Sequence, residues 1–367
     1  MSPVARKYAA HALILGAALA PAAALAPAAS ASPATINSLS AISCYSASDC
    51  WAGGGGSSGA ALIATTDGGA RWSAQFSSPK LTGITAIDCP SARDCMAVAG
   101  TGTGGSEVLA TTDAGKAWNV RPVPRPMVFG ETVSCAGSSD CWLIGLPQPP
   151  VNAVIAHTTD GGATWSVQRA PKLETAMSTP FGLYCTSALD CMATGEGVLA
   201  TSDGGARWAE YPVPHDIPLG PTVCPSARDC LSVFNVTSAI PSHEETYLYT
   251  TADGGRRWED VLATPAHVDG LPGISCASAS TCVAVGSGYT PQGGGKYGFY
   301  ALAETTTSGG RKWAEHKYPA AQYLYGVSCP RGTRECIAVG TVNSSRAVIV
   351  RSANDGASWA AEPLPGA

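Results

Sequence analysis

Short apolar runs recur along the chain, and Gly, Ser, Asp or Pro separates each run from the next. The runs at 62–64, 96–99 and 108–110 are apolar at consecutive positions, without the alternation that marks a sheet with one solvated face. Runs of this length between turn residues predict short β-strands that are packed on both faces. Between residues 84 and 123 we expect four of them, at 84–88, 96–99, 107–111 and 118–123.

The turn between the third and fourth expected strands carries the most regular motif of the chain, Ser/Thr-x-Asp-x-Gly-x-x-Trp. One copy consists of Thr111, Asp113, Gly115 and Trp118. Thr and Asp side chains accept hydrogen bonds from nearby main-chain N–H groups, and Gly adopts a positive φ without steric cost. The motif therefore predicts a tight turn that its own side chains close, with the Trp returning into the core.

This motif occurs seven times, which predicts an array of similar units. Five copies carry Asp, and the last two carry Ser308 and Asn354 in its place. The five aspartates are Asp67, Asp113, Asp160, Asp203 and Asp253. The tryptophans are Trp72, Trp118, Trp165, Trp208, Trp258, Trp313 and Trp359. Seven units of four short strands predict an all-β fold, a seven-bladed β-propeller of four-stranded antiparallel blades, as one domain over 32–367.

The motif resembles the Asp-box, or BNR repeat, of sialidases, sortilin ectodomains, xyloglucanases and propellers similar to the photosystem II stability/assembly factor. The likeness covers nearly all of the chain after residue 31. It implies the same propeller fold, with an Asp-box turn between the third and fourth strands of each blade. In those families the box is a structural turn remote from the ligand site, so it marks a fold and not an activity.

The 14 cysteines follow the same repeat, with one pair before each copy of the motif. Six pairs are spaced C-x5-C and the last is C-x6-C. The pairs are Cys44/Cys50, Cys89/Cys95, Cys135/Cys141, Cys185/Cys191, Cys224/Cys230, Cys276/Cys282 and Cys329/Cys336. In an exported chain, such an even and repeated set predicts disulfides. Zinc is the alternative, but the chain has no C-x2-C spacing, and we expect neither a metal nor a cofactor.

Residues 1–31 resemble a secretory signal peptide. Arg6 and Lys7 precede an apolar run, and 29–31 read Ala-Ser-Ala, a cleavage pattern. Of the 22 Lys and Arg, these two fall in this segment, which leaves 20 basic against 27 acidic residues, a net charge of −7. We therefore expect a secreted, extracellular monomer that binds no nucleic acid and inserts into no membrane after cleavage.

Strand order then predicts where a ligand binds. In an antiparallel meander, the turn between the first and second strands and the turn between the third and fourth lie at one end of the blade. All cysteine pairs and motif turns therefore share one end, which we call the turn end. The irregular loops lie at the other end, which we call the loop end. Ligand-binding residues usually lie on such loops over a rigid scaffold.

The candidate ligand-binding residues are the unrepeated charged and aromatic side chains of these loops. They are Arg121, Arg125, His215, Asp216, His243, Glu244, Glu245, His267, Asp269, Tyr289, Tyr297, Tyr323 and Tyr325. Groups of this kind suit contacts to a protein or to a carbohydrate. Ordinary solvated loop residues are the competing interpretation for each one.

Catalysis finds less support in the sequence, and we assign no catalytic residue. Ten of the 15 Asp recur at repeat positions, five in the motif and five before the second cysteine of a pair, so repetition assigns them to turns. A sialidase needs three Arg around a carboxylate and an Arg-Ile-Pro segment, which is absent. We therefore favour a secreted, non-catalytic scaffold that binds a protein or cell-surface glycan. The alternative is an exported glycoside hydrolase of sialidase-like fold, with Glu244 or Glu245 acting alongside Asp216 or Asp269.

Overall fold

The computed structural model describes residues 36–148, 152–168, 182–214, 218–236, 245–263, 267–293, 296–343 and 345–365, with only the main chain at 235–236, 245 and 262–263. The chain divides into two units, Met1–Ser32 and Pro33–Ala367. All described residues belong to the second unit. The expected signal peptide therefore lies outside the described residues.

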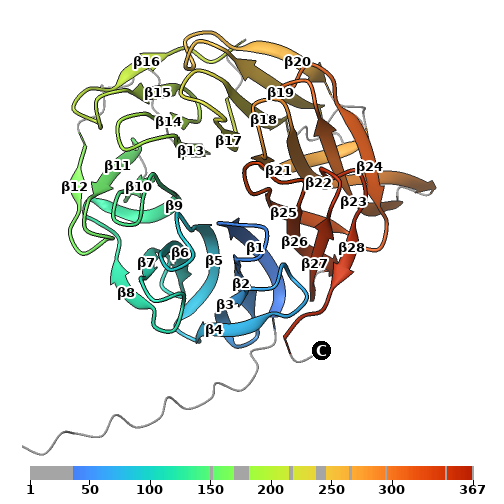
Figure 1. Cartoon of the computed structure of the whole chain (residues 1–367), viewed down its shortest axis with the longest axis horizontal. Coiled ribbons are helices and arrows are strands. Elements are labelled where there is room, and N and C mark those ends of the chain that lie inside the picture. The colour runs from blue at the N-terminus through green and yellow to red at the C-terminus, as the bar shows by residue number, and fades with distance from the viewer. Residues whose placement is uncertain are drawn as a thin grey trace, which may run out of the picture. The chain divides into compact units, whose positions relative to one another are not determined.

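The described residues form 28 strands in seven four-stranded sheets, so the predicted seven-bladed propeller is confirmed. Each sheet contains four consecutive strands in chain order, and every pairing is antiparallel. Figure 1 shows the first strand of each sheet nearest the centre of the ring and the fourth at the rim. We number the sheets blade 1 to blade 7 along the chain.

The strands of blades 1 to 4 are β1 (Ile36–Cys44), β2 (Cys50–Gly56), β3 (Gly59–Thr65), β4 (Ser73–Ser78), β5 (Leu81–Asp88), β6 (Cys95–Thr101), β7 (Ser106–Thr111), β8 (Asn119–Pro122), β9 (Met127–Cys135), β10 (Cys141–Pro147), β11 (Val154–Thr158), β12 (Ser166–Val167), β13 (Gly182–Cys185), β14 (Cys191–Thr194), β15 (Val198–Thr201) and β16 (Ala209–Tyr211). Those of blades 5 to 7 are β17 (Thr222–Val223), β18 (Cys230–Val236), β19 (Glu245–Thr251), β20 (Glu259–Ala263), β21 (Val268–Cys276), β22 (Cys282–Gly293), β23 (Lys296–Thr306), β24 (Ala314–Tyr318), β25 (Tyr323–Ser328), β26 (Cys336–Asn343), β27 (Arg346–Ser352) and β28 (Ala360–Glu362).

All seven cysteine pairs form disulfides, as the repeat predicts. The bridges are Cys44–Cys50, Cys89–Cys95, Cys135–Cys141, Cys185–Cys191, Cys224–Cys230, Cys276–Cys282 and Cys329–Cys336. Each bridge joins the end of the first strand of a blade to the start of the second. Seven local disulfides indicate an oxidising environment such as the cell exterior.

The motif turns are closed by hydrogen bonds from the motif itself. In blade 2 the Thr111 hydroxyl donates to Asp113 Oδ1 (2.9 Å), which also accepts from the Ala117 N–H (3.0 Å). In blade 6 the Ser308 hydroxyl accepts from the Lys312 N–H (2.9 Å), so Ser performs part of the role of Asp. The backbone of each motif turn also donates to the cysteine turn of its own blade, as Ala114 N–H does to the Arg93 carbonyl (2.9 Å).

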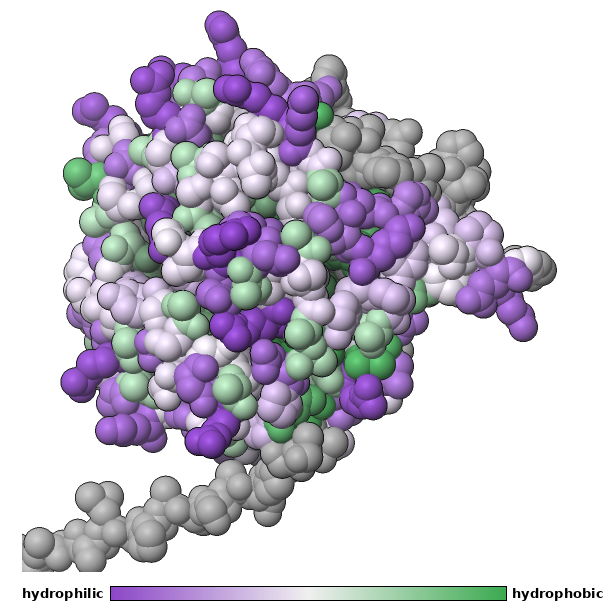
Figure 2. All heavy atoms as spheres, turned by 45° about the vertical axis from the view of Figure 1, so that its right-hand side comes forward, coloured by the Kyte–Doolittle hydropathy of each residue, from purple (hydrophilic) through white to green (hydrophobic). Residues whose placement is uncertain are grey.

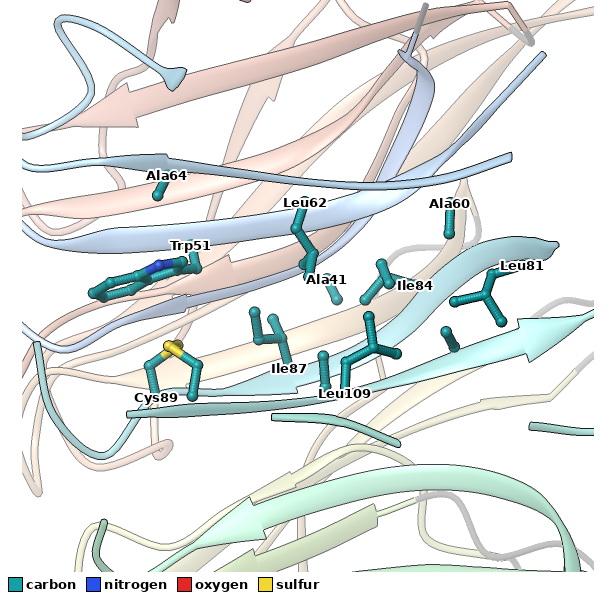
Figure 3. Packing of buried hydrophobic residues seen from close by; sticks show 13 residues of the cluster. Ala41, Trp51, Ala60, Leu62, Ala64, Leu81, Ile84, Ile87, Cys89 and Leu109 are labelled. Carbon is teal, nitrogen blue, oxygen red and sulfur yellow. A yellow bond between two sulfur atoms is a disulfide. The ribbon is translucent and has the colours of Figure 1, made fainter. Parts of the chain in front are cut away.

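Neighbouring blades interlock through the residue that follows the second cysteine of each pair. Trp142 is completely buried, stacks on His157 with ring centroids 3.9 Å apart, and lies beneath the motif turn of blade 4. A Cβ at Gly205, the glycine of that turn with φ 81°, would lie 2.5 Å from the Trp142 ring. Figure 3 shows the corresponding Trp51 between blades 1 and 2, in one cluster with Ile87.

A belt of hydrogen bonds links the innermost strands around most of the ring. In each case, the side chain of the residue before a blade's first cysteine is the acceptor. The donor is the main-chain N–H of the first cysteine in the following blade, and the donor–acceptor distances are 2.7 to 3.0 Å. The acceptors are Ser43, Asp88, Ser134, Ser275 and Ser328. The last of these bonds joins Ser328 of blade 7 to Cys44 of blade 1. The ring therefore closes by packing and hydrogen bonding, with complete sheets on both sides of the closure.

One local expectation is wrong. Tyr289 and Tyr297 were expected in an irregular loop, but they lie in the antiparallel hairpin of β22 and β23, because its alternating aromatic residues favour strands. The innermost strand of blade 1 covers 36–44, and 33–35 lies outside the described residues.

Candidate binding site

The hairpin of β22 and β23 sets blade 6 apart at the loop end. These strands have 12 and 11 residues, whereas the second and third strands of the other blades have at most eight in the described part of the chain. Figure 1 shows the long hairpin beside β24, on the right of the ring. It carries unrepeated residues away from the common framework of the blades.

Five aromatic side chains gather along one face of this hairpin and the adjacent strand of blade 7. We call them the aromatic patch: Tyr289, Tyr297, Phe299, Tyr323 and Tyr325. The rings of Tyr289 and Tyr297 meet edge to face at 5.3 Å, Phe299 lies 5.6 Å from Tyr323, and Tyr323 stacks on Tyr325 at 6.0 Å. Tyr289 also lies opposite Phe299 in the hairpin. The patch is therefore one continuous line of rings across two blades.

The outer rings of this patch remain accessible. Tyr297 is 39% exposed and Phe299 is 37% exposed. On the face shown in Figure 2, hydrophobic residues are scattered among hydrophilic ones and form only small groups. Exposed aromatic rings beside polar groups are typical of surfaces that bind partners.

Polar side chains border the aromatic patch. The Ser287 hydroxyl donates to Asp269 Oδ2 (3.0 Å). His267 Nε2 lies 2.8 Å from Glu315 Oε2, but Glu315 lies opposite Glu304 and therefore on the other face of the sheet. Burial raises the pKa of Tyr323, and the nearby carboxylate of Asp269 raises it further. Tyr323 is therefore a neutral hydroxyl at physiological pH, available as a hydrogen-bond donor beside a carboxylate.

The opposite face of the hairpin is hollowed and carries polar groups. A cavity of about 350 Å3 is bordered by Thr290, Gln292, Gly298, Phe299, Tyr300, Lys317 and Pro319. Lys317 Nζ lies 4.7 Å from the centre of the Tyr300 ring and 3.5 Å from Glu315 Oε1. The hairpin thus presents aromatic rings on one side and hydrogen-bonding groups on the other.

A larger cavity, of about 820 Å3, lies at the turn end between blades 4 and 5. The hydrogen-bonded belt lapses at this place, because Tyr184 occupies the position of a serine acceptor. It lapses again between blades 5 and 6, where Val223 occupies that position. The innermost strand of blade 5 is also only two residues long. With a short inner strand and no belt contact, the two blades leave space between their turns, bordered by Asp203, Arg207 and other turn residues.

Two arginine side chains bond to residues that border this cavity. Arg331 comes from the C-x6-C turn of blade 7, and its Nη2 donates to the Tyr184 hydroxyl and to the Cys224 carbonyl, both at 3.3 Å. Arg256 Nε donates to the Tyr211 hydroxyl at 3.3 Å. Sequence reasoning missed Tyr184 and Arg331. The available signals were a Tyr in a serine position and the one cysteine turn with an extra residue.

The aspartates around this cavity are already engaged in turns. Asp203 Oδ1 accepts from the Thr201 hydroxyl (3.0 Å) and from the Arg207 N–H (2.9 Å), and the Arg207 N–H bond is the main cause of the lowered pKa of Asp203. Asp253 makes the equivalent bonds in blade 5. These carboxylates serve the fold, so we regard the aromatic patch as the stronger candidate for a ligand site.

The structure unites part of the predicted residue set. His267, Asp269, Tyr289, Tyr297, Tyr323 and Tyr325 all belong to blades 6 and 7 at the loop end, although all of them except His267 lie in strands and not in loops. Arg121 lies in β8, and its guanidinium donates to the Ala163 carbonyl of a motif turn (3.3 Å), while Arg125 is exposed between blades 2 and 3.

The remaining candidates cannot be placed. His215, Asp216, His243 and Glu244 lie outside the described residues, and only the main chain of Glu245 is described. Among the described residues, no three His, Cys, Asp or Glu side chains are arranged to hold a metal ion. In the same ranges no helix has the length and apolar character needed to cross a membrane.

Comparison with known proteins supports the fold alone. No protein-family model matches the sequence, and no curated protein sequence matches it. YCF48 bound to a D1 peptide superposes with a TM-score of 0.60 at 15% identity, covering 88% of this chain and 93% of YCF48. YCF48 from Cyanidioschyzon merolae gives 0.60 at 12% identity, covering 87% and 96%.

A GH74 xyloglucanase from Xanthomonas campestris gives a TM-score of 0.63 at 12% identity. The match covers 88% of this chain and 53% of the enzyme, so this chain spans about half of that protein. The structural neighbours therefore include both a protein solved with a bound peptide and a glycoside hydrolase.

Proposed function

We propose that this chain is an exported, non-catalytic binding propeller that holds a protein or cell-surface glycan at its loop end, with the aromatic patch at the centre of the site. The aromatic patch carries this proposal, because unrepeated side chains from two blades converge there with accessible rings. Tyr rings supply apolar contact area and a hydroxyl at low entropic cost, which suits recognition. The turn end, in contrast, uses its polar groups to close turns.

A neighbour in fold and the features that indicate export are consistent with this proposal, and the motif turns keep a structural role. We interpret the seven motif turns as Asp-box repeats, since Thr111 and Asp113 bond within the turn as that structural role requires. YCF48, a neighbour in fold, has been solved with a D1 peptide. The signal-like segment at 1–31 and the seven disulfides support export. We propose a monomer that acts as a scaffold.

The rival is an exported glycoside hydrolase, favoured by the GH74 neighbours and by Asp269 at the border of the aromatic patch. Its acid and base would be Glu244 or Glu245 with Asp216 or Asp269. Assays of the purified protein on aryl sialosides and a polysaccharide panel separate the two functions. Turnover that disappears in Glu244→Gln or Asp269→Asn, with the fold intact, would overturn the binding proposal.

Binding is tested by presenting the immobilised protein to a glycan array and to culture supernatant proteins. We expect one partner class to be retained by the wild type and lost by the double variant Tyr297→Ser/Phe299→Ser. A matched double variant at the turn end, Arg207→Ser/Arg228→Ser, controls for general surface changes and should retain the partner. Equal retention by the wild type and the patch variant would contradict the proposal.

A further inference from the structure

We infer that an extended peptide segment of a partner protein adds as a strand to the edge of β23 between Lys296 and Tyr300. This inference rests on the proposed function and names the partner class and its binding mode. It begins with the unequal lengths of the strands in blade 6. The fourth strand, β24, pairs with β23 only over Ala301–Thr305. In the described part of the chain, no strand lies beside the rest of that edge.

Pairing parity shows which main-chain groups point outward from this edge. The Tyr289 N–H leaves the hairpin to donate to the His267 carbonyl (2.8 Å), and Tyr289 lies opposite Phe299. Two residues that lie opposite one another in an antiparallel pair either both direct their N–H and C=O groups toward the partner strand or both direct them away from it. Phe299 therefore points its N–H and C=O away from β22. Tyr297 does so as well, two residues along, where it lies opposite Pro291.

Ala301 confirms this parity on the same strand. Its N–H points outward and donates to the Ala321 carbonyl at 2.9 Å. The edge of β23 that pairs with β24 thus continues along Phe299 and Tyr297, and the N–H and C=O groups of these residues point in the same direction as those of Ala301. A peptide strand in line with β24 could therefore form main-chain hydrogen bonds with both residues.

The other edge of the hairpin is closed to such an addition. Beyond Tyr289, β22 carries Pro291, which has no N–H to offer a neighbouring strand. Proline on one edge is a common means of preventing unwanted strand pairing. The edge of β23 between Lys296 and Tyr300 carries no proline, so one edge is blocked and the other is open.

The surroundings define the chemistry of the peptide. Side chains of an added strand alternate between the two faces of the hairpin. On one side they meet Tyr297 and Phe299, which suit apolar or aromatic residues. On the other they meet the cavity bordered by Gln292 and Lys317, whose side chain is 51% exposed. Lys296 adds a second positive charge at the end of the edge. The fitting segment alternates apolar with acidic residues.

The first test uses a defined probe, a capped peptide in which Val alternates with Glu, and its counterpart methylated at alternate main-chain nitrogens. Binding to the intact secreted protein is followed by NMR titration. We expect the plain peptide to bind and the N-methylated peptide to bind at least tenfold more weakly, since each methyl group removes a main-chain hydrogen-bond donor. Equal affinities, or no binding of the plain peptide at millimolar concentration, would overturn strand addition.

Matched variants test the same edge from the side of the protein. Phe299→Ala removes the ring and keeps the N–H, whereas Phe299→Pro removes both without touching the ladder to β22. We expect the proline variant to bind the plain peptide at least tenfold more weakly than the alanine variant. Equal binding by the two variants contradicts strand addition. Should the proline variant fail to fold, the N-methylated peptide still decides with wild-type protein.

Three outcomes separate this inference from the proposed function. If the patch variant loses the supernatant partners but the plain and N-methylated peptides bind equally, the binding site stands and strand addition is refuted. Concentration-dependent dimers that Phe299→Pro abolishes would assign the edge to a second copy of this chain and refute the peptide partner. If the immobilised protein retains polysaccharide and no protein, the peptide partner is refuted and the ligand is a glycan.

Discussion

The two ends of the blades use different residue types for different purposes. At the turn end, the Thr111 hydroxyl accepts from the Gly115 N–H and the Asp113 carboxylate accepts from the Ala117 N–H of the same turn. Bonds equivalent to that of Thr111 recur in all seven blades. At the loop end of blades 6 and 7, Tyr297 and Phe299 are partly exposed and occur once. Repetition thus marks residues that build the fold, and departure from repetition marks candidates for recognition.

The junction of blades 4 and 5 refines this comparison. Departure from repetition also occurs there, where Tyr184 replaces a serine of the belt and Arg331 crosses from blade 7. Those side chains bond to one another and to the main chain, so these unrepeated residues stabilise the junction of blades 4 and 5, where the belt is missing. An unrepeated residue is a ligand candidate when its side chain remains accessible, as Tyr297 and Phe299 do in the aromatic patch.

The largest expected effect on stability comes from Trp142→Ala. This ring is completely buried between blades 3 and 4, so truncation should lower the free energy of unfolding by about 3–5 kcal/mol. Chemical denaturation of the oxidised protein measures the change. Trp118→Ala is the matched control, because that ring is only partly buried and should cost less. If Trp142→Ala lowers the free energy of unfolding by less than Trp118→Ala does, Trp142 does not hold blades 3 and 4 together as described.

A smaller effect depends on pH. Glu304 is 2% exposed and lies opposite Glu315, and burial, followed by the charge of Glu315, raises the pKa of Glu304 from 4.5 to about 7. The folded state therefore binds this proton more tightly than the unfolded state. The free energy of unfolding should fall as pH rises from about 4.5 to about 7, by on the order of 3 kcal/mol.

Denaturation series between pH 4.5 and pH 8 measure this dependence, and Glu304→Gln should remove the part that Glu304 contributes. Asp88, whose pKa burial raises to about 6, should keep its own part in that variant. Asp113 supplies a contrast at the turn end. Hydrogen bonding to the Ala117 N–H lowers its pKa, so its contribution is lost on acidification instead. An unchanged pH profile in Glu304→Gln would show that another group controls stability in this range.

A more modest loss is expected for the motif itself. Asp113→Ala leaves the Ala117 N–H without its acceptor and should cost about 1–2 kcal/mol. Ser308→Ala in blade 6 should cost less, because a neutral hydroxyl is the weaker acceptor there. Thermal unfolding of both variants gives the order. Neither change should alter partner binding, and a stable Asp113→Ala protein that no longer binds would reverse the roles of the two ends.

The smallest effect on stability belongs to the aromatic patch. Tyr297→Ser and Phe299→Ser alter partly exposed rings and should each change the free energy of unfolding by about 0.5 kcal/mol or less. The same denaturation experiment measures it. A loss of several kcal/mol would mean that the patch is a structural cluster, which would remove the basis of the proposed function.

The fold could be predicted from the sequence because the motif and the cysteine pair each recur seven times. The period of Trp118 and its equivalents, the cysteine spacing and the strand order are all local signals. Tyr184 and Arg331 lie 147 residues apart, and no local pattern reveals that they bond. The long hairpin was also misjudged, because its glycines and Pro291 indicate a loop while the cross-strand pairing of Tyr289 with Phe299 stabilises strands.

The central claim is that ligand binding belongs to the loop end of blades 6 and 7. Amide hydrogen exchange of the protein with and without its captured partner tests it most directly. We predict slower exchange on binding at 286–293, 296–300 and 323–325, with the turn segments 201–207 and 224–230 unchanged. Protection confined to those turn segments, around the cavity between blades 4 and 5, would contradict the account.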